Sequence, residues 1–148
     1  MNLRINNFFL WAAAVAFLTL HAPLALHAQT LLTKDEKAVQ TVVQNQLTAF
    51  GKDDADKAFS YAAPELRKSI GSSSAFMAMV RGSYPVVYRP ASVVFLKPEK
   101  SGDDVIQQVQ MLDASGASWL AVYSLQRQKG GLWRISGCAV IENKNRTI

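Results

Sequence analysis

The chain has 148 residues, of which 49% are hydrophobic and 18% are charged, and its formal net charge is +5. This length suits one compact domain and is too short for two. The basic residues are scattered along the chain rather than gathered in a stripe, which excludes the extended cationic face that nucleic-acid binding needs.

The first 28 residues have the layout of a secretory signal peptide. Arg4 and the amino terminus supply positive charge, and an uncharged apolar run follows from Phe8 to Leu20. Ala28 is a small residue at the expected cut, so we predict a signal peptide over 1–28 with cleavage after Ala28. Residues 29–148 then form a single exported domain, periplasmic or secreted, with no membrane span. A retained anchor helix is the alternative, since the apolar stretch is just long enough to cross a membrane.

Cleavage would remove both histidines, His21 and His27, from the exported protein. Without histidine, a Ser-His-Asp or Cys-His catalytic arrangement and a histidine metal site are excluded. The one cysteine, Cys138, cannot build a structural zinc site. A magnesium or calcium site made only of carboxylates is the alternative, but the sequence has no loop of suitably spaced carboxylates, so we expect no metal, no cofactor and no catalytic residue. We expect Cys138 to pack as a small buried apolar side chain. An intermolecular disulfide is the alternative.

The first third of the exported chain carries the signals of amphipathic helices. Thr33 to Glu36 has the form of a capping box, and apolar residues then recur on one helical face as far as Phe50. Asp53 and Asp54 are placed to cap a second helix, which Pro64 ends.

Two further helical signals follow. Pro64 is suited to open a short helical turn that closes at Gly71. Serines 72–74 cap the last of the three main helices, which carries Phe76 and ends at Gly82.

Two prolines in the segment Tyr84 to Pro90 predict a stiff extended connector to the second half of the chain. The hydroxyl groups of Tyr84 and Tyr88 are candidates to bind a ligand, and Arg89 is a candidate to pair with an anion. In the alternative interpretation, the tyrosines close the end of the core and their hydroxyls bond to the backbone.

The second half changes to the alternating pattern of strands. Four strands are predicted, over Ser92–Lys97, Val105–Leu112, Trp119–Arg127 and Leu132–Ile141. Gly130-Gly131 predicts a hairpin between the last two. Three helices followed by a meander of about four strands indicate an α+β fold. Such a sheet buries one face by curving over the helices, which makes a cone with a pocket at its wide end.

A two-residue turn at Gly130-Gly131 would place Tyr123 opposite the neighbourhood of Cys138. It would also assign the side chains of the last two strands to two faces: Trp119, Ala121, Tyr123, Leu125, Arg134, Ser136 and Cys138 on one, and Leu120, Val122, Ser124, Trp133, Ile135 and Ala139 on the other. Both faces are partly apolar, so we predict a homodimer formed through the sheet. A loop one residue longer would exchange the faces of one strand.

Aromatic and polar residues in these elements are the candidate lining of the pocket. They are Tyr61, Phe76, Tyr84, Tyr88, Arg89, Trp119, Tyr123 and Trp133. An enzyme would need one of the carboxylates Asp54, Glu65 or Asp113 buried beside a tyrosine, with a raised pKa. Each has a structural explanation, as a helix cap, a helix start or a turn residue.

A family resemblance runs through most of the exported chain, from about Val39 to Val140. The matching positions are Gln46-Leu47, Ala49-Phe50, Asp54, Ala58-Phe59, Ala63-Pro64, Phe76, Met79-Val80, Tyr84-Pro85, Tyr88-Arg89-Pro90, Gln108-Val109, Asp113, Gly116, Trp119-Leu120-Ala121, Tyr123, Leu125, Arg127-Gln128, Trp133-Arg134-Ile135 and Gly137-Cys138. In these residues the chain resembles an uncharacterised bacterial family, domain of unknown function 4864, of the nuclear transport factor 2-like superfamily. The resemblance implies the curved α+β cone and implies no activity, because superfamily members include isomerases, dehydratases and proteins that only bind.

These observations predict an exported, non-enzymatic binding or interaction domain. It would bind a small, partly apolar ligand in the cone, or an envelope protein through the sheet. The alternative is an enzyme that carries out isomerase- or dehydratase-like proton transfer with a buried carboxylate and a tyrosine.

Overall fold

The structure, a computed structural model, describes residues 33–144. The predicted signal segment, residues 1–28, and the predicted cleavage after Ala28 lie outside the described residues. Within the described part, none of the helices combines the length and the apolar character that a membrane crossing requires.

Residues 33–144 begin with five helices, which range from 4 to 18 residues in length. They are α1 (Lys34–Gly51), α2 (Ala55–Ser60), α3 (Pro64–Ile70), α4 (Ser73–Ser83) and α5 (Pro85–Tyr88). The predicted capping box is confirmed: the Glu36 N–H donates to Thr33 Oγ1 at 3.2 Å, and the Thr33 N–H donates to Glu36 Oε2 at 2.6 Å. Asp54 caps α2 and Ser72 caps α4, each by accepting from a backbone N–H three residues on.

The extended connector predicted from Tyr84 to Pro90 is wrong, because α5 occupies its centre. Pro85 stands at the first position of α5, where its fixed φ fits a helix and its missing N–H is not needed. The N–H groups of Val87 and Tyr88 both donate to the Tyr84 carbonyl, at 2.9 and 3.0 Å. The chain therefore makes one more helical turn before it enters the sheet.

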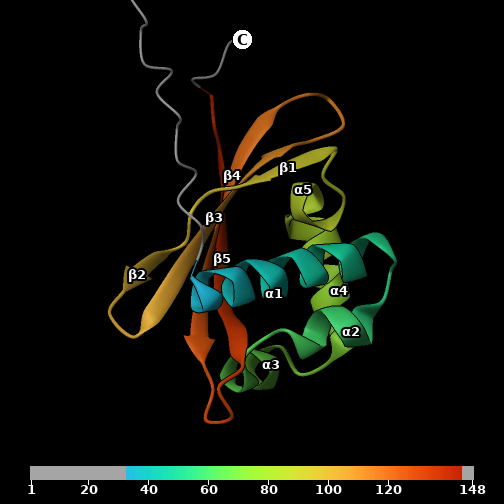
Figure 1. The fold of residues 1–148 in the computed structure, drawn as a ribbon. Coiled ribbons are helices and arrows are strands. Elements are labelled where there is room, and N and C mark those ends of the chain that lie inside the picture. Colours follow the sequence, from blue (N-terminus) through green and yellow to red (C-terminus); the bar gives the residue numbers. More distant parts are fainter. Residues whose placement is uncertain (1–32, 145–148) are drawn as a thin grey trace, which may run out of the picture. The chain divides into compact units, whose positions relative to one another are not determined.

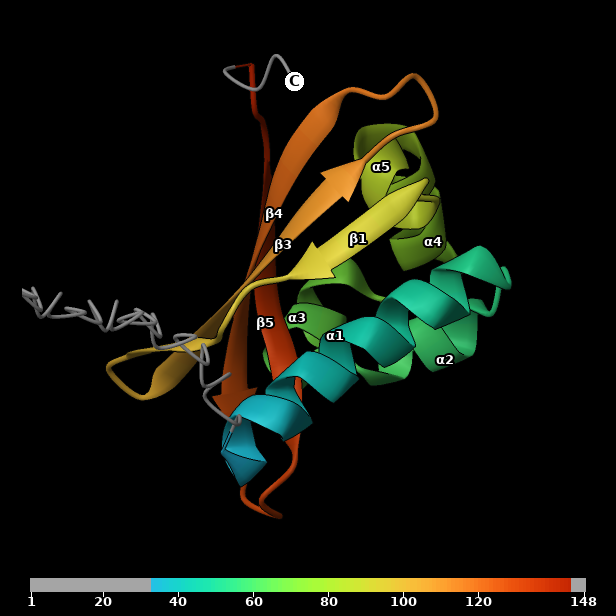
Figure 2. The same cartoon turned by 45° about the horizontal axis from the view of Figure 1, so that its top comes forward.

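The second half forms a five-stranded antiparallel sheet. Its strands are β1 (Ser92–Phe95), β2 (Glu99–Ser101), β3 (Asp104–Leu112), β4 (Ser118–Arg127) and β5 (Trp133–Glu142). Their order is β1-β3-β4-β5, and β2 pairs with the other end of β3. The helices lie together on one side of the sheet (Figures 1 and 2), so the predicted α+β architecture is confirmed.

The predicted register at the start of β5 is wrong by one residue. Arg127 pairs with Trp133, so the connection is longer than the two glycines, and the Gln128 N–H donates to the Leu132 carbonyl at 2.8 Å. Trp133 and Ile135 are consequently buried on the same face as Tyr123, whereas the prediction had placed them on the opposite face. Arg134, predicted to share the face of Tyr123, takes the opposite one.

A β-bulge then restores the predicted register. Leu125 pairs with Ile135 whereas Ser124 pairs with Gly137, so Ser136 is the extra residue on β5. Beyond the bulge Tyr123 pairs with Cys138, as predicted. The bulge thus lets both ends of β5 present apolar side chains to the helices.

The core lies between the inner face of the sheet and α1. Val39, Val43 and Phe50 of α1 are almost completely buried, as are Val109 of β3 and Leu125 of β4. This packing is what holds the helices on the sheet, because burial of apolar surface is the main stabilising contribution.

The outer edge of β5 is partly covered by the link between α2 and α3. The Ile135 N–H donates to the Tyr61 carbonyl at 2.9 Å, and the Ala63 N–H donates to the Ile135 carbonyl at 2.7 Å. These bonds satisfy edge groups that would otherwise be open to another chain. They also fix α3 beside the residues of β5 that line the pocket described next.

Candidate ligand pocket

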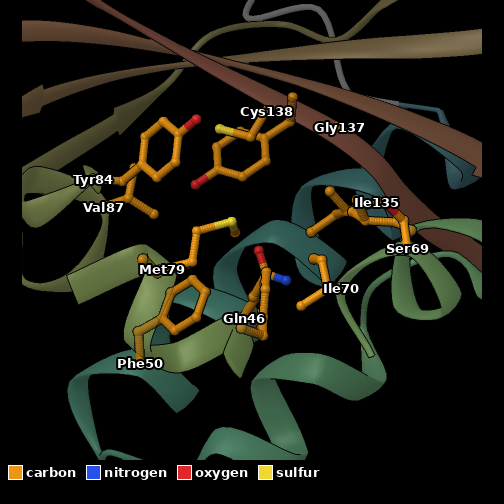
Figure 3. A pocket seen from close by; sticks show the side chains of 14 residues that line it. Gln46, Phe50, Ser69, Ile70, Met79, Tyr84, Val87, Ile135, Gly137 and Cys138 are labelled. Atoms are coloured by element: carbon orange, nitrogen blue, oxygen red, sulfur yellow. The ribbon is translucent and has the colours of Figure 1, made fainter. Parts of the chain in front are cut away.

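A cavity of about 350 Å³ lies between the helices and the last two strands (Figure 3). Its lining comes from four helices and two strands: Gln46 and Phe50 of α1, Leu66, Ser69 and Ile70 of α3, Phe76, Met79 and Val80 of α4, Tyr84 and Val87 around α5, Tyr123 of β4, and Ile135, Gly137 and Cys138 of β5. The volume is in the range of pockets that hold small organic molecules.

Aromatic and aliphatic side chains make up most of the cavity wall. The rings of Phe50 and Phe76 lie 5.6 Å apart between centroids, and Phe59 extends the cluster with its ring 5.5 Å from that of Phe76. Tilted rings at this distance attract one another in addition to burying apolar area. The cluster gives the cavity a firm apolar wall that favours an apolar occupant.

Tyr123 brings an unsatisfied hydroxyl group into this apolar cavity. Its side chain is 1% exposed, and the hydroxyl makes no hydrogen bond of normal geometry to a described residue, although it contacts the Cys138 thiol, which is a weak hydrogen-bonding group. A buried polar group without a partner costs about 1–3 kcal/mol, so the hydroxyl needs a partner from outside the protein. Burial raises the pKa of Tyr123 well above its usual value, and contact with Cys138 raises it further, so the hydroxyl stays protonated.

Gln46 adds a second polar group on the facing wall. Its side-chain amide nitrogen donates to the Ala58 carbonyl at 3.1 Å. Because a carbonyl only accepts, the nitrogen must face Ala58, which turns Oε1 the other way. Figure 3 shows that oxygen directed into the cavity. Gln46 is 3% exposed, so Oε1 is an acceptor on a buried side chain.

Cys138 packs against the core as predicted, with its sulfur directed into the cavity (Figure 3). Burial raises the pKa of its thiol to about 12, only partly offset by the contact with Tyr123. A thiol with this pKa holds very little thiolate at neutral pH and is a poor nucleophile. An intermolecular disulfide would require the sulfur to turn out of the cavity.

The three candidate carboxylates all lie away from the cavity. Asp54 accepts from the Lys57 N–H at 3.0 Å as the cap of α2, and Glu65 is exposed in the first turn of α3. Asp113 organises the turn between β3 and β4, where it accepts from the Ser115 hydroxyl at 2.6 Å and from Trp119 Nε1 at 2.8 Å. These bonds lower its pKa to about 2.

The candidate lining residues divide among several places. Phe76, Tyr84 and Tyr123 line the cavity. Tyr84 also borders a second, more polar hollow of about 420 Å³, which contains Arg89 and Trp119. The predicted set therefore overlaps the lining of this cavity at three residues.

The remaining candidates lie outside the cavity. Tyr61 follows α2 with Lys57 Nζ 5.6 Å from its ring centroid. Trp133 lies near the start of α1, where its Nε1 donates to Asp35 Oδ1 at 3.5 Å. Tyr88 belongs to a surface cluster that is described below.

The surface cluster is centred on Asp53, which the sequence had indicated only as a helix cap. Its carboxylate accepts from Arg81 Nη2 at 2.8 Å, from Arg89 Nη2 at 2.9 Å and from the Tyr88 hydroxyl. The Tyr88 bond is the largest cause of a lowered pKa at Asp53, followed by that of Arg81. Because the two arginines are already paired with the carboxylate and half exposed, this cluster serves to fix α5 against the end of α1.

Gln46 and Met79 are two of the eleven pocket residues that the sequence prediction missed. Gln46 gave a signal, because it is a polar residue on the apolar face of α1, three residues after Val43 and four before Phe50. Met79 gave none, since its 39% exposure at the cavity mouth follows only from how α4 meets α3. Among residues 33–144, no cluster of His, Cys, Asp and Glu side chains is suited to a metal ion.

Comparison with known proteins agrees with this fold. Residues 32–148 match the sequence pattern of the family described as Domain of unknown function (DUF4864). A solved structure of an NTF-2 like protein of unknown function from Silicibacter pomeroyi DSS-3 is 18% identical with a TM-score of 0.51, over 76% of this chain and 100% of that one. An NTF2-like protein of unknown function from Shewanella baltica OS155 is 11% identical with a TM-score of 0.49, over 78% of this chain and 100% of that one. A search of curated proteins finds no match.

Proposed function

Because the chain belongs to the DUF4864 family, whose description assigns no activity, we propose a function from the pocket itself: binding of a small, largely apolar molecule. The observation that carries this proposal is the buried Tyr123 hydroxyl, which has no hydrogen-bond partner among the described residues and faces an apolar cavity of about 350 Å³. A ligand that fills the cavity and bonds to this hydroxyl would remove the cost of its isolation.

The pocket offers hydrogen bonds rather than a general base. Burial raises the pKa of both Tyr123 and Cys138, so neither loses its proton near neutral pH. The described lining residues include neither a carboxylate nor a cation. Isomerase- or dehydratase-like proton transfer therefore has no carboxylate base in this cavity, which favours binding over catalysis.

The mouth of the pocket lies between α3 and α4. Ser69 of α3 is exposed and Met79 of α4 is 39% exposed, and both line the cavity. Methionine is flexible and adapts to varied apolar partners. A ligand would enter past these two side chains and reach Tyr123 at the sheet.

The test uses N-phenyl-naphthylamine, an uncharged dye that fluoresces in apolar surroundings. Protein expressed from the full sequence should bind it saturably. Ser69→Trp places a large side chain at the mouth and should weaken binding at least about tenfold. Lys68→Trp is the matched control, because Lys68 is the exposed neighbour on α3 that does not line the cavity.

Two outcomes would count against the pocket. Failure of the unmodified protein to bind the dye would remove the proposal, provided that its thermal unfolding is cooperative. Equal loss of binding in Ser69→Trp and Lys68→Trp would place the dye elsewhere.

We also propose a homodimer formed through the outer face of the sheet. The register aligns Val94, Gln110, Leu120 and Ile141 in one row across four strands. Val94 is 56% exposed and Ile141 is 57% exposed, at the two ends of this row. Exposed apolar side chains aligned across a sheet are typical of surfaces that another protein covers.

Light scattering tests the dimer against association with an envelope protein. A dimeric mass at micromolar concentration that Ile141→Lys reduces to the monomer would support self-association. Leu132→Lys is the control, because Leu132 is equally exposed but lies in the hairpin loop. A monomeric mass for the unmodified protein would contradict the dimer and leave the face for a different partner.

Export is the third part of the proposal, and it rests on the apolar run from Phe8 to Leu20 after Arg4. The mass of the protein recovered from the periplasm or medium should correspond to a start at Gln29. A mass that retains residues 1–28, in a membrane fraction, would support the anchor instead.

A further inference from the structure

The polar groups of the cavity restrict the chemistry of its ligand beyond what its apolar wall does. We infer that the ligand is an uncharged molecule with an apolar body and one hydroxyl group, which accepts a hydrogen bond from Tyr123 and donates one to Gln46. This inference rests on the proposed binding function and narrows it to a class of compound.

Charge on the ligand is disfavoured by every described wall of the cavity. The lining contains no arginine, lysine or carboxylate, and its polar atoms belong to neutral side chains. Transfer of a carboxylate or an ammonium group into such surroundings, without an opposite charge, costs far more than one hydrogen bond returns. An acid or an amine with the same carbon skeleton should therefore bind more weakly than the neutral compound.

A hydroxyl group is favoured over a carbonyl because the two protein groups have different needs. Gln46 Oε1 only accepts, and its own amide nitrogen is already engaged with the Ala58 carbonyl. Tyr123 has a hydroxyl hydrogen to donate and, among residues 33–144, no partner for it beyond the contact with the Cys138 thiol. A ketone would bond to Tyr123 and leave Gln46 unpaired, whereas an alcohol satisfies both.

A ligand hydroxyl group also suits the positions of Gln46 and Tyr123, which lie on opposite sides of the cavity. Gln46 projects from α1, and Tyr123 projects from β4, so their polar atoms approach the same cavity from the helical layer and from the sheet. A ligand hydroxyl between them would bridge the two layers, while the apolar body lies against Phe50, Phe76 and Ile135.

The test compares three compounds with the same eight carbons: n-octanol, methyl hexyl ketone and octanoate. Affinities for protein expressed from the full sequence are measured by calorimetry at neutral pH. The octanol affinity should exceed that of the ketone about threefold to tenfold, the effect of one hydrogen bond, and that of octanoate by more than about tenfold. Octanoate that binds as tightly as octanol would overturn the inference.

Variants then assign the preference to the two side chains. Gln46→Leu should abolish the preference for octanol over the ketone, because both then bond only to Tyr123. Tyr123→Phe should weaken both compounds, and Tyr61→Phe, outside the cavity, should weaken neither. If Gln46→Leu fails to fold, the series on the unmodified protein still decides the outcome.

The results separate this inference from the proposed function. Binding of N-phenyl-naphthylamine together with equal affinities for all three compounds would refute the hydroxyl preference and leave the pocket standing. Absence of binding for the dye and for all three compounds would refute both.

Discussion

Replacement of Tyr123 by phenylalanine should make the unliganded protein more stable and its ligand complex weaker. The side chain is 1% exposed on β4, and its hydroxyl has no partner among the described residues. The substitution removes only that oxygen and leaves the ring in place. Deletion of a buried, unsatisfied hydroxyl should therefore raise the free energy of unfolding by about 1–3 kcal/mol.

Urea or thermal unfolding measures this change. A gain of about 1 kcal/mol should raise the Tm by about 4 °C in a domain of this size. Tyr61→Phe is the control, because Tyr61 is half-buried outside the cavity, and its effect should stay within about 0.5 kcal/mol. Saturating n-octanol should raise the Tm of the unmodified protein by more than it raises the Tm of the Tyr123→Phe variant.

Destabilisation by Tyr123→Phe would refute the reasoning. A loss of about 1 kcal/mol or more would mean that the hydroxyl has a partner in solution, such as a water molecule held in the cavity. The cavity would then be hydrated rather than dry, and the hydroxyl would give no argument for a ligand.

Three further substitutions examine the fold around the pocket. Asp113→Asn should destabilise the protein at pH 6 by weakening the turn that holds Trp119. The pKa of Asp113 in the folded protein is about 2, below its ordinary value of 3.8. The difference in urea midpoint between the variant and the unmodified protein should therefore shrink as the pH falls from 4 to 2. The pKa of Cys138 is raised from 9.0 to about 12, so its contribution to stability is complete below pH 9 and is lost as the pH rises toward 12; unfolding midpoints should fall less steeply in this range for Cys138→Ala. At pH 8 the folded protein should hold about 1000-fold less thiolate than the unfolded protein, and an aromatic disulfide reagent should react with it correspondingly more slowly. Leu125→Ala should cost about 2–5 kcal/mol in chemical unfolding, because the side chain is completely buried between sheet and helices, whereas Leu132→Ala, in the exposed hairpin loop, should cost less than about 0.5 kcal/mol. The described packing would be contradicted if Leu132→Ala lowered the free energy of unfolding substantially, or if Leu125→Ala left it unchanged.

Local signals in the sequence were sufficient for the long helices and for the order of the elements. The capping box at Thr33 and the serine cap at Ser72 each act within four residues, so neither depends on the rest of the fold. Pro85 shows the limit of such rules, because proline suits both an extended connector and the first position of a helix. The hydrogen bonds to the Tyr84 carbonyl decide between them.

The register of β5 could not be obtained from local signals. The longer hairpin loop moves the strand by one residue, and the bulge at Ser136 moves it back. The two changes cancel beyond Gly137, so Tyr123 and Cys138 were correctly paired although Trp133 and Ile135 were assigned to the wrong face. Only burial of Trp133 and Ile135 against the helices explains why the chain accepts a bulge here.

Three of the seven aromatic residues predicted for the site line the cavity, and Gln46 was not predicted for it. Phe76, Tyr84 and Tyr123 were among the candidates because aromatic side chains commonly line ligand pockets. Gln46 was noted only as part of the family resemblance, and its position on an apolar helix face acquires meaning once Ala58 is seen to bind its amide nitrogen. A buried glutamine has to satisfy three or more hydrogen-bonding sites, and that requirement appears only in three dimensions.

Methyl NMR of the protein with carbon-13-labelled methionine, titrated with n-octanol, tests the ligand pocket most directly. Met79 lines the mouth of the cavity, whereas Met111 is buried outside it and is 1% exposed. We predict a saturable shift of the Met79 methyl signal with the Met111 signal unchanged. A Met79 signal that stays in place up to the solubility limit of octanol would contradict binding in this pocket.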